Sequence, residues 1–313
     1  MSRSETTLAG RWVKWAATGL VALQADRLSH AHLTRKDVMT RCGHPPDHPD
    51  DEVDALSWSA EGAHGLILFE SGLGLPYECW DWMLQLAPKN QDVLLYNRCG
   101  IGRTSREIGE AQCQQRIADL INQYSELTII AHSIGSLAAC DLLEKGLIDD
   151  RVRVKVYLID PTDDELIASS QSDRRLRLLL AQSFQAQILG SILGTSYRAS
   201  MLDSDVNYRS SVERKLLHVE SSPRTAFAGQ REHKRFASNP PRLESIADVV
   251  EAVVSAEINS DHNVQHQIRQ RKLADRLSAR HVIVSRSNHF SLIGTESSSH
   301  EVAEAIWGRS RRS

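Results

Sequence analysis

The sequence predicts an α/β fold, in which a mostly parallel sheet is flanked by helices and interrupted by a helical insertion. Short apolar, β-branched runs alternate with stretches of helical periodicity from residue 65 onward. This alternation stops between residues 162 and 246, where leucine-rich helical stretches replace the strands. Strands that alternate with helices imply right-handed crossovers and a parallel sheet. A chain of 313 residues is long enough for one such domain with a sizeable core.

The predicted elements follow one another in a regular order within a main domain over residues 65–313. A strand over 65–70 precedes a helix over 77–86, and a strand over 92–96 precedes a helix over 105–124. In the second helix Ile117, Leu120, Ile121 and Tyr124 recur at helical spacing. Further strands are expected over 127–130, 154–160, 249–258 and 281–284, and further helices after residue 135, over 264–277 and over 299–307.

Two parts of the chain depart from this rhythm. Residues 1–64 form an N-terminal region, in which we expect a peripheral helix over 15–23 and an edge strand between 26 and 42. A weak signal peptide is the alternative for that apolar stretch, although Leu23 is too large for the position it would hold before a cut after Ala25. In the insertion, 162–246, an apolar face indicates a lid or helices that pack on the core; its members are Leu176, Leu179, Leu180, Phe184, Ile188 and Ile192.

Composition narrows the class of partner. Hydrophobic residues make up 41% of the chain and charged residues 25%, as is usual for a soluble globular protein. The formal charge of −3 does not point to nucleic acid, and no apolar run is long enough for a transmembrane span. Five cysteines without a CxxC pair predict free thiols and a cytoplasmic location. The His- and Asp-containing loop over 42–54 is interpreted as a solvated loop rather than a metal site.

The strand, turn and helix over residues 127–146 are the strongest chemical signal. Ser133 lies in the turn, and such a turn lifts a hydroxyl away from the sheet edge while the helix N-terminus behind it offers free N–H groups. The pattern G-x-S-x-G is typical of a nucleophilic serine, and here Ala131 replaces the first glycine while Gly135 keeps the second. The motif therefore needs partners elsewhere in the chain.

Two later segments supply such partners. Asp261 follows the predicted strand over 249–258, and His289 follows the strand over 281–284. In a parallel sheet these residues meet Ser133 at the carboxyl edge, where open α/β folds place their sites. The residues 71–74, Ser-Gly-Leu-Gly, end an earlier strand beside the serine turn, where a loop that binds an oxyanion would lie.

With these segments in this order, the chain resembles the α/β-hydrolase superfamily, and specifically its lidded esterase-like members. The segments are FESGLG, YNRCGIGRTS, AHSIGS, VYLIDPT and SNHF. The resemblance implies that Ser133 is the nucleophile, that His289 is the general base, and that a carboxylate orients the histidine. It further implies an oxyanion hole made by the backbone N–H groups of Leu73 and Ile134, with no metal or organic cofactor. Ser71 stands where many members carry a histidine, which affects support of the loop rather than its donors.

The sequence leaves the identity of the carboxylate open. Asp261 precedes His289 by 28 residues (289 − 261), which is enough for one helix and one strand. Asp160 ends the preceding strand of the sheet and is the main rival, and Glu257 is a third choice. The spacing favours Asp261 over Asp160.

The predicted activity is hydrolysis of an ester or related acyl bond through a seryl intermediate. The substrate is expected to be a small molecule, and the apolar face of the insertion favours a hydrophobic acyl or alcohol group in it. A triad on this fold also supports acyl transfer, amide or C–C cleavage, or cofactor-free peroxidase chemistry. A non-catalytic ligand-binding protein that keeps the fold is the alternative from another class. The altered serine motif and the open choice of acid are its support.

Overall fold

The computed structural model describes residues 39–172, 174–196, 206–257 and 263–308. Seven strands form one sheet in the order β1-β3-β2-β4-β5-β6-β7. Only β1 (Ala55–Trp58) is antiparallel to its neighbour, and the other pairs are parallel. The predicted α/β fold with a mostly parallel sheet is confirmed.

The remaining strands lie close to their predicted positions because each contains a short apolar run, although the last strand lies at the sheet edge and is partly exposed. They are β2 (Gly65–Glu70), β3 (Asp92–Tyr96), β4 (Glu126–His132), β5 (Arg153–Ile159), β6 (Val250–Ala256) and β7 (Arg280–Val284). The register pairs Ala131 on β4 with Glu70 on one side and Leu158 on the other. The carboxyl ends of β2, β4 and β5 therefore lie at one edge of the sheet.

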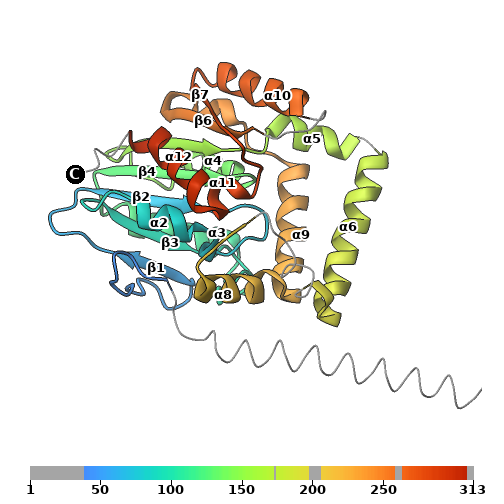
Figure 1. Ribbon diagram of the computed structural model, residues 1–313, viewed down its shortest axis with the longest axis horizontal. Helices are drawn as coiled ribbons and strands as arrows, with labels where there is room; N and C mark the ends of the chain where they lie inside the picture. Colours follow the sequence, from blue (N-terminus) through green and yellow to red (C-terminus); the bar gives the residue numbers. More distant parts are fainter. Residues whose placement is uncertain (1–38, 173, 197–205, 258–262, 309–313) are drawn as a thin grey trace, which may run out of the picture.

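Helices cover both faces of the sheet (Figure 1). One core contains side chains of α3 (Glu110–Ile121), α4 (Gly135–Glu144) and α10 (Asn263–Arg276). The other contains side chains of η1 (Tyr77–Trp80), α2 (Asp81–Leu86), α11 (Ser291–Gly294) and α12 (Glu296–Trp307). The strands' apolar residues alternate between these two cores.

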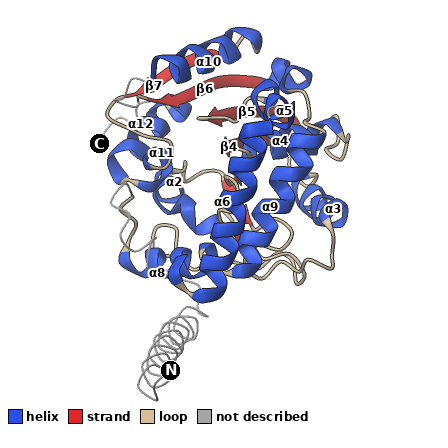
Figure 2. Ribbon diagram, turned by 90° about the vertical axis from the view of Figure 1, so that its right-hand side faces the viewer, coloured by secondary structure: helices blue, strands red, loops and turns tan. Residues whose placement is uncertain are grey.

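The insertion between β5 and β6 is helical in its described residues and stands beyond one end of the sheet (Figures 1 and 2). It contains α5 (Asp164–Ser172), α6 (Arg174–Leu193), α8 (Ser210–Glu220), α9 (Pro223–Ser238) and η2 (Leu243–Val249). Ion pairs tie it to the main domain: Arg209 to Asp81, Lys215 to Glu78, and Arg98 to Glu232. These pairs anchor α8 and α9 over the carboxyl edge.

The apolar face predicted for α6 forms only in part. Ile188 is buried, but Leu179 is 62% exposed and Ile192 is 48% exposed. Leu180 and Phe184 instead line a groove against α9. The helix packs on α9 and α5 rather than on the sheet, which leaves one of its apolar sides uncovered.

The N-terminal region is described only from residue 39, so the helix expected over 15–23 and most of the strand expected over 26–42 lie outside the described residues. One edge of the sheet is β1, which lies later in the chain than the expected strand, and the other edge is β7. All five cysteines are free thiols. Among the described helices, none has the length and apolar character that crossing a bilayer requires.

Candidate active site

Ser133 lies in a tight turn between β4 and α4. Its φ of 56° is in the left-handed region, which a residue with a side chain adopts only when the surroundings hold it there. The Ser133 N–H donates to the carbonyl of Ile159 on β5 at 3.0 Å. The Ser133 carbonyl accepts from the N–H of Thr162 at 3.1 Å and from the Ser136 hydroxyl at 2.7 Å. The sharp turn predicted from the motif is therefore fixed by hydrogen bonds to the next strand.

Close packing explains the glycine after the serine. A Cβ atom on Gly135 would lie 2.4 Å from the carbonyl oxygen of Glu70, so no larger residue fits while α4 approaches β2 this closely. The loop after β2 lies against the same turn. A Cβ atom on Gly72 would lie 3.5 Å from Cβ of Ser133 and 3.0 Å from Cδ1 of Leu75. The two segments predicted to form the oxyanion hole are thus neighbours.

Two backbone donors at this junction are available to a ligand. Among the described residues, neither the N–H of Leu73 nor that of Ile134 donates a hydrogen bond to a protein group. Ile134 is the residue before α4, so its N–H lies at a helix N-terminus where anions are stabilised. Free N–H groups in this position suit a developing oxyanion.

A buried ionic cluster supports the loop over residues 71–74, which follows β2. Arg98 donates to the carbonyl oxygens of Ser71 at 2.7 Å and Gly72 at 2.8 Å. It also pairs with Glu70 at 3.2 Å and with Glu232 of α9 at 2.5 Å. Arg98 therefore has a structural role, because its hydrogen bonds and ion pairs join the loop after β2 to the insertion.

Glu70 supports this loop indirectly, because it pairs with Arg98, which donates to the loop carbonyls. Burial raises its pKa to about 7, although Arg98 and a hydrogen bond from the Tyr96 hydroxyl favour the charged form. The carboxyl is buried and satisfied by these two partners.

His289 follows β7 and pairs with Asp160. Its Nδ1 lies 2.5 Å from Oδ2 of Asp160, which ends β5. The histidine side chain is 33% exposed, whereas that of the aspartate is 1% exposed. Burial alone raises the pKa of Asp160, but hydrogen bonds from His266 and His289 outweigh it and hold this pKa well below its usual range. An ionised carboxylate only accepts hydrogen bonds, so Nδ1 of His289 carries a proton and Nε2 is left as a base.

The other two candidate acids have different positions. Glu257 is exposed and accepts a hydrogen bond from the N–H of Arg286 at 3.0 Å. Asp261, which the spacing favours, lies outside the described residues. The structure brings Asp160, the main rival, to His289. The physical reason is that β5 lies next to β4 in the sheet, while the loop after β7 reaches back across β6.

His132 precedes Ser133 in the chain. Its ring lies 4.6 Å from the ring of His289, and its Nε2 is 2.9 Å from the His289 carbonyl oxygen. Burial, with a smaller contribution from His289, lowers the pKa of His132 to about 3. A carbonyl only accepts, so Nε2 carries the proton of this neutral ring. His132 thus supports the backbone of His289.

No hydrogen bond joins the Ser133 hydroxyl to His289 among the described residues. The two residues are neighbours through His132, which precedes the serine and bonds to the histidine's carbonyl. Such bonds are commonly long in free enzymes and shorten when substrate binds.

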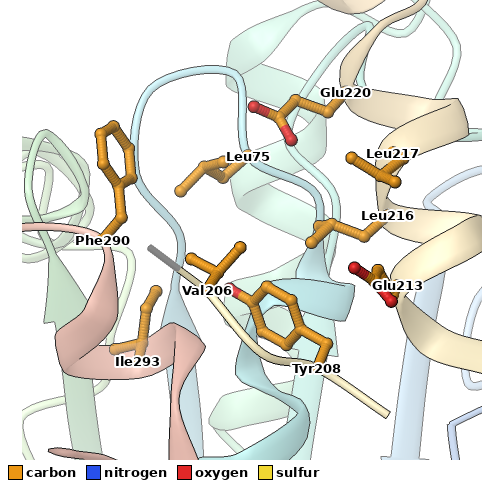
Figure 3. A pocket seen from close by; sticks show the side chains of 9 residues that line it. All are labelled: Leu75, Val206, Tyr208, Glu213, Leu216, Leu217, Glu220, Phe290 and Ile293. Carbon is orange, nitrogen blue, oxygen red and sulfur yellow. The ribbon is translucent and has the colours of Figure 1, made fainter. Parts of the chain in front are cut away.

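A cavity of about 90 Å³ opens beside these residues (Figure 3). Leu75, which follows the loop over residues 71–74, lines this cavity, and so does Phe290, the residue after His289. Its walls are mainly apolar, and two carboxylates of α8 also line it. The full lining is Leu75, Val206, Tyr208, Glu213, Leu216, Leu217, Glu220, Phe290 and Ile293.

One residue of the site, His266, was not predicted from the sequence. His266 of α10 lies 2.8 Å from Oδ1 of Asp160, and nothing in its sequence neighbourhood forms a motif. Within the described ranges, no group of three or more His, Cys, Asp or Glu side chains is arranged to hold a metal ion. That finding covers the His- and Asp-containing loop over 42–54.

Solved structures of enzymes share the fold at low sequence identity. A carboxylesterase of the thaumarchaeon Nitrososphaera gargenis has a TM-score of 0.55 and 14% identity, over 81% of this chain and 93% of that one. A thermophilic esterase from Thermogutta terrifontis has a TM-score of 0.55 and 13% identity, over 81% and 91%. A bromoperoxidase from Bacillus anthracis has a TM-score of 0.52 and 11% identity, over 81% and 94%.

Comparison with curated protein sequences gives no match. A family profile does match, and it spans residues 66–305, from the first parallel strand to the last helix. The match includes the serine turn, Asp160 and His289. The chain therefore belongs to the alpha/beta hydrolase family.

Proposed function

We propose that this protein is a serine hydrolase that cleaves an ester or related acyl bond through a covalent acyl-enzyme. Ser133 is the nucleophile, His289 the general base and Asp160 the acid that orients the base. The observation that carries this proposal is the 2.5 Å contact between Nδ1 of His289 and Asp160, at the sheet edge where Ser133 occupies a left-handed turn. A buried carboxylate bound to Nδ1 selects the tautomer that the base needs.

The first half of the reaction forms the acyl-enzyme. The Ser133 hydroxyl attacks the carbonyl carbon, and its proton moves to Nε2 of His289. The carbonyl oxygen gains the negative charge, and the N–H groups of Leu73 and Ile134 donate to it. The tetrahedral intermediate then breaks its bond to the alcohol oxygen, which takes the proton from His289 as it leaves. Asp160 stays ionised throughout and stabilises the charged imidazole.

The second half of the reaction hydrolyses the acyl-enzyme and regenerates the free enzyme. Water gives a proton to Nε2 of His289 and attacks the acyl carbon, and the same two N–H groups hold the new oxyanion. When the acid product leaves, the proton returns from His289 to the Ser133 oxygen. Every step uses groups of this chain.

The cavity beside His289 supports an uncharged, apolar substrate group. Leu75, Phe290 and Ile293 provide hydrophobic contacts, while Glu213 and Glu220 carry negative charge at the same cavity. A substrate carboxylate there would meet like charges in a partly enclosed space, which disfavours binding. We expect p-nitrophenyl butyrate to be cleaved at least tenfold faster than p-nitrophenyl hemisuccinate. The five free thiols support a reducing location, and we propose the cytoplasm.

A fluorophosphonate probe tests the proposal, because it forms a stable bond only with an activated serine. We expect the purified wild type to be labelled at Ser133, with the site found by peptide mass spectrometry. Ser133→Ala and His289→Ala should not be labelled, and Asp160→Asn should be labelled far more slowly.

Two variants control the choice of acid. Glu257→Gln should be labelled as fast as the wild type, because Glu257 bonds to the Arg286 backbone and not to His289. Asp261→Asn tests the candidate that sequence spacing favours. Loss of labelling in Asp261→Asn, with Asp160→Asn unaffected, would reverse the assignment. A folded wild type that does not label would favour a non-catalytic binding protein.

A further inference from the structure

The acid of the proposed triad binds two histidines rather than one. Oδ2 of Asp160 accepts from His289, while Oδ1 lies 2.8 Å from Nε2 of His266 and 3.3 Å from the N–H of Ala256. His266 belongs to α10, which packs on the two last strands. Its side chain is 20% exposed, so the contact with the buried carboxylate is largely shielded from water.

The chemistry of the carboxylate fixes the direction of this hydrogen bond. Asp160 is ionised and only accepts, so Nε2 of His266 carries a proton and donates it. A carboxylate bonded through one oxygen is free to rotate about its χ2 torsion, which is a broad and weakly restricted rotation. With donors on both oxygens, rotation would break a charge-assisted hydrogen bond on either side.

The backbone supports the carboxylate of Asp160 through the N–H of Ala256, which lies 3.3 Å from Oδ1. Asp160 has a φ of 43°, in the left-handed region that residues with side chains rarely adopt. Its N–H donates to the Val254 carbonyl. The side chain therefore depends on its own hydrogen bonds, and His266 supplies the strongest one that does not come from the base itself.

We propose that His266 is a positioning residue, which donates to Oδ1 of Asp160 and thereby holds Oδ2 against Nδ1 of His289. The proposal rests on the proposed function, in which Asp160 orients the base. The hydrogen bond from His266 also partly compensates the negative charge of Asp160. This compensation limits how strongly Asp160 stabilises the protonated form of His289. Loss of His266 should both misplace the acid and leave more of the carboxylate's charge for His289.

Several other titratable groups face this cluster, and the experiment must allow for them. His289 contacts Asp160 directly, and His132 at the end of β4 faces both. His281 on β7 faces His266 and bonds through Nε2 to the Ser255 hydroxyl at 2.8 Å. Within the described chain, His281 makes no hydrogen bond or ion pair with Asp160, which makes it a matched control on the neighbouring strand.

The test compares His266→Ala, His266→Gln and His281→Gln in the full chain, by ester hydrolysis between pH 5 and 9. Loss of a hydrogen bond to a charged group should lower kcat about tenfold in His266→Ala, with KM changed less than twofold. The acid limb of the kcat profile should also move, because the contact between Asp160 and His289 sets how readily the base is protonated. The amide Nε2 of His266→Gln occupies nearly the place of the ring Nε2, so this variant should recover most of kcat. His281→Gln should match the wild type.

Proton NMR adds a readout that needs no turnover. The Nδ1 proton shared by His289 and Asp160 should give a strongly deshielded resonance in the wild type and in His266→Gln, and a broadened one in His266→Ala. Wild-type kcat and an unshifted acid limb in folded His266→Ala would overturn the inference, as would a His266→Gln variant as impaired as the alanine variant. If the wild type fails to label at Ser133, the proposed function fails. The NMR comparison still decides whether His266 orders the Asp160–His289 pair.

Discussion

Two histidines lie against each other beside the candidate nucleophile, and their surroundings differ. His132 is fully buried, and among the described residues its ring hydrogen-bonds to a backbone carbonyl and to no carboxylate. His289 is one-third exposed, and its Nδ1 meets an ionised aspartate. The rings are 4.6 Å apart, so the two histidines occupy the same part of the site. The two histidines differ in whether the ring has a hydrogen-bonded carboxylate that can compensate a positive charge.

The comparison explains why a residue adjacent to the serine is the wrong choice of base. Burial lowers the pKa of His132 to about 3, which means that taking a proton there costs free energy. His289 can take a proton because Asp160 stabilises the charged ring and solvent reaches it. His132 instead holds the backbone of His289 in place.

The largest expected effect comes from removing the groups that react. Ser133→Ala and His289→Ala should each lower kcat for p-nitrophenyl butyrate by about 10⁴-fold or more, since neither the nucleophile nor the base has a substitute. His132 would take over if proximity were enough. A His289→Ala variant that kept more than about a tenth of wild-type kcat would therefore break the comparison.

The second effect concerns the carboxylate itself. Asp160→Asn should lower kcat by about 10² to 10⁴-fold, because an amide keeps the shape but no longer selects the reactive tautomer of His289. KM should change little, since Asp160 does not line the cavity beside the site. A matched Asp163→Asn variant changes a nearby carboxylate that pairs with Arg276, and it should keep wild-type kcat.

The third effect tests the supporting role of His132. His132→Leu removes the donor to the His289 carbonyl, and should lower kcat about three- to tenfold and the free energy of unfolding by about 1–3 kcal/mol. His132→Gln places an amide N–H near the former Nε2 and should recover part of both losses. Urea denaturation and steady-state kinetics check the two quantities. Loss of labelling by the fluorophosphonate in folded His132→Gln would show that the ring has a direct role.

The smallest effect is a change in the pH dependence of stability. The pKa of His132 is about 3 in the folded protein and near its ordinary value of 6.5 in the unfolded chain, so between these values the unfolded state binds more protons. This residue therefore makes the protein less stable as pH falls from 6.5 toward 3, by about 1.4 kcal/mol for each pH unit. Urea midpoints measured from pH 7 to pH 4.5 should fall more gently for His132→Leu than for the wild type. Parallel curves would place the proton uptake elsewhere.

Sequence patterns predicted the parallel strands because each contains an apolar run that neighbouring polar turns delimit. The turn at Ser133 was also predictable from local sequence, because close packing requires a glycine at position 135. A Cβ atom there would lie only 2.4 Å from the carbonyl oxygen of Glu70. Leu73 and Ile134 followed from their places beside that turn. They stay predictions as oxyanion donors, although their N–H groups make no hydrogen bond within the described chain.

The carboxylate could not be identified in this way. Spacing along the chain favoured Asp261, whereas the contact that the structure describes joins His289 to Asp160, 129 residues away. Sequence separation carries no information about which loop crosses which strand at a sheet edge. The same holds for His266, which has no motif of its own and reaches Asp160 only because α10 packs beside β6.

The sequence by itself determined the fold class, the nucleophile turn and the histidine after the last strand, because each depends on local periodicity or on close contacts between neighbouring segments. Only the tertiary structure decided which carboxylate meets His289, which histidine stays neutral and which cavity adjoins them. Those outcomes depend on burial and on charges brought together across the sheet, and the pKa of a side chain is set by these surroundings rather than by its neighbours in sequence.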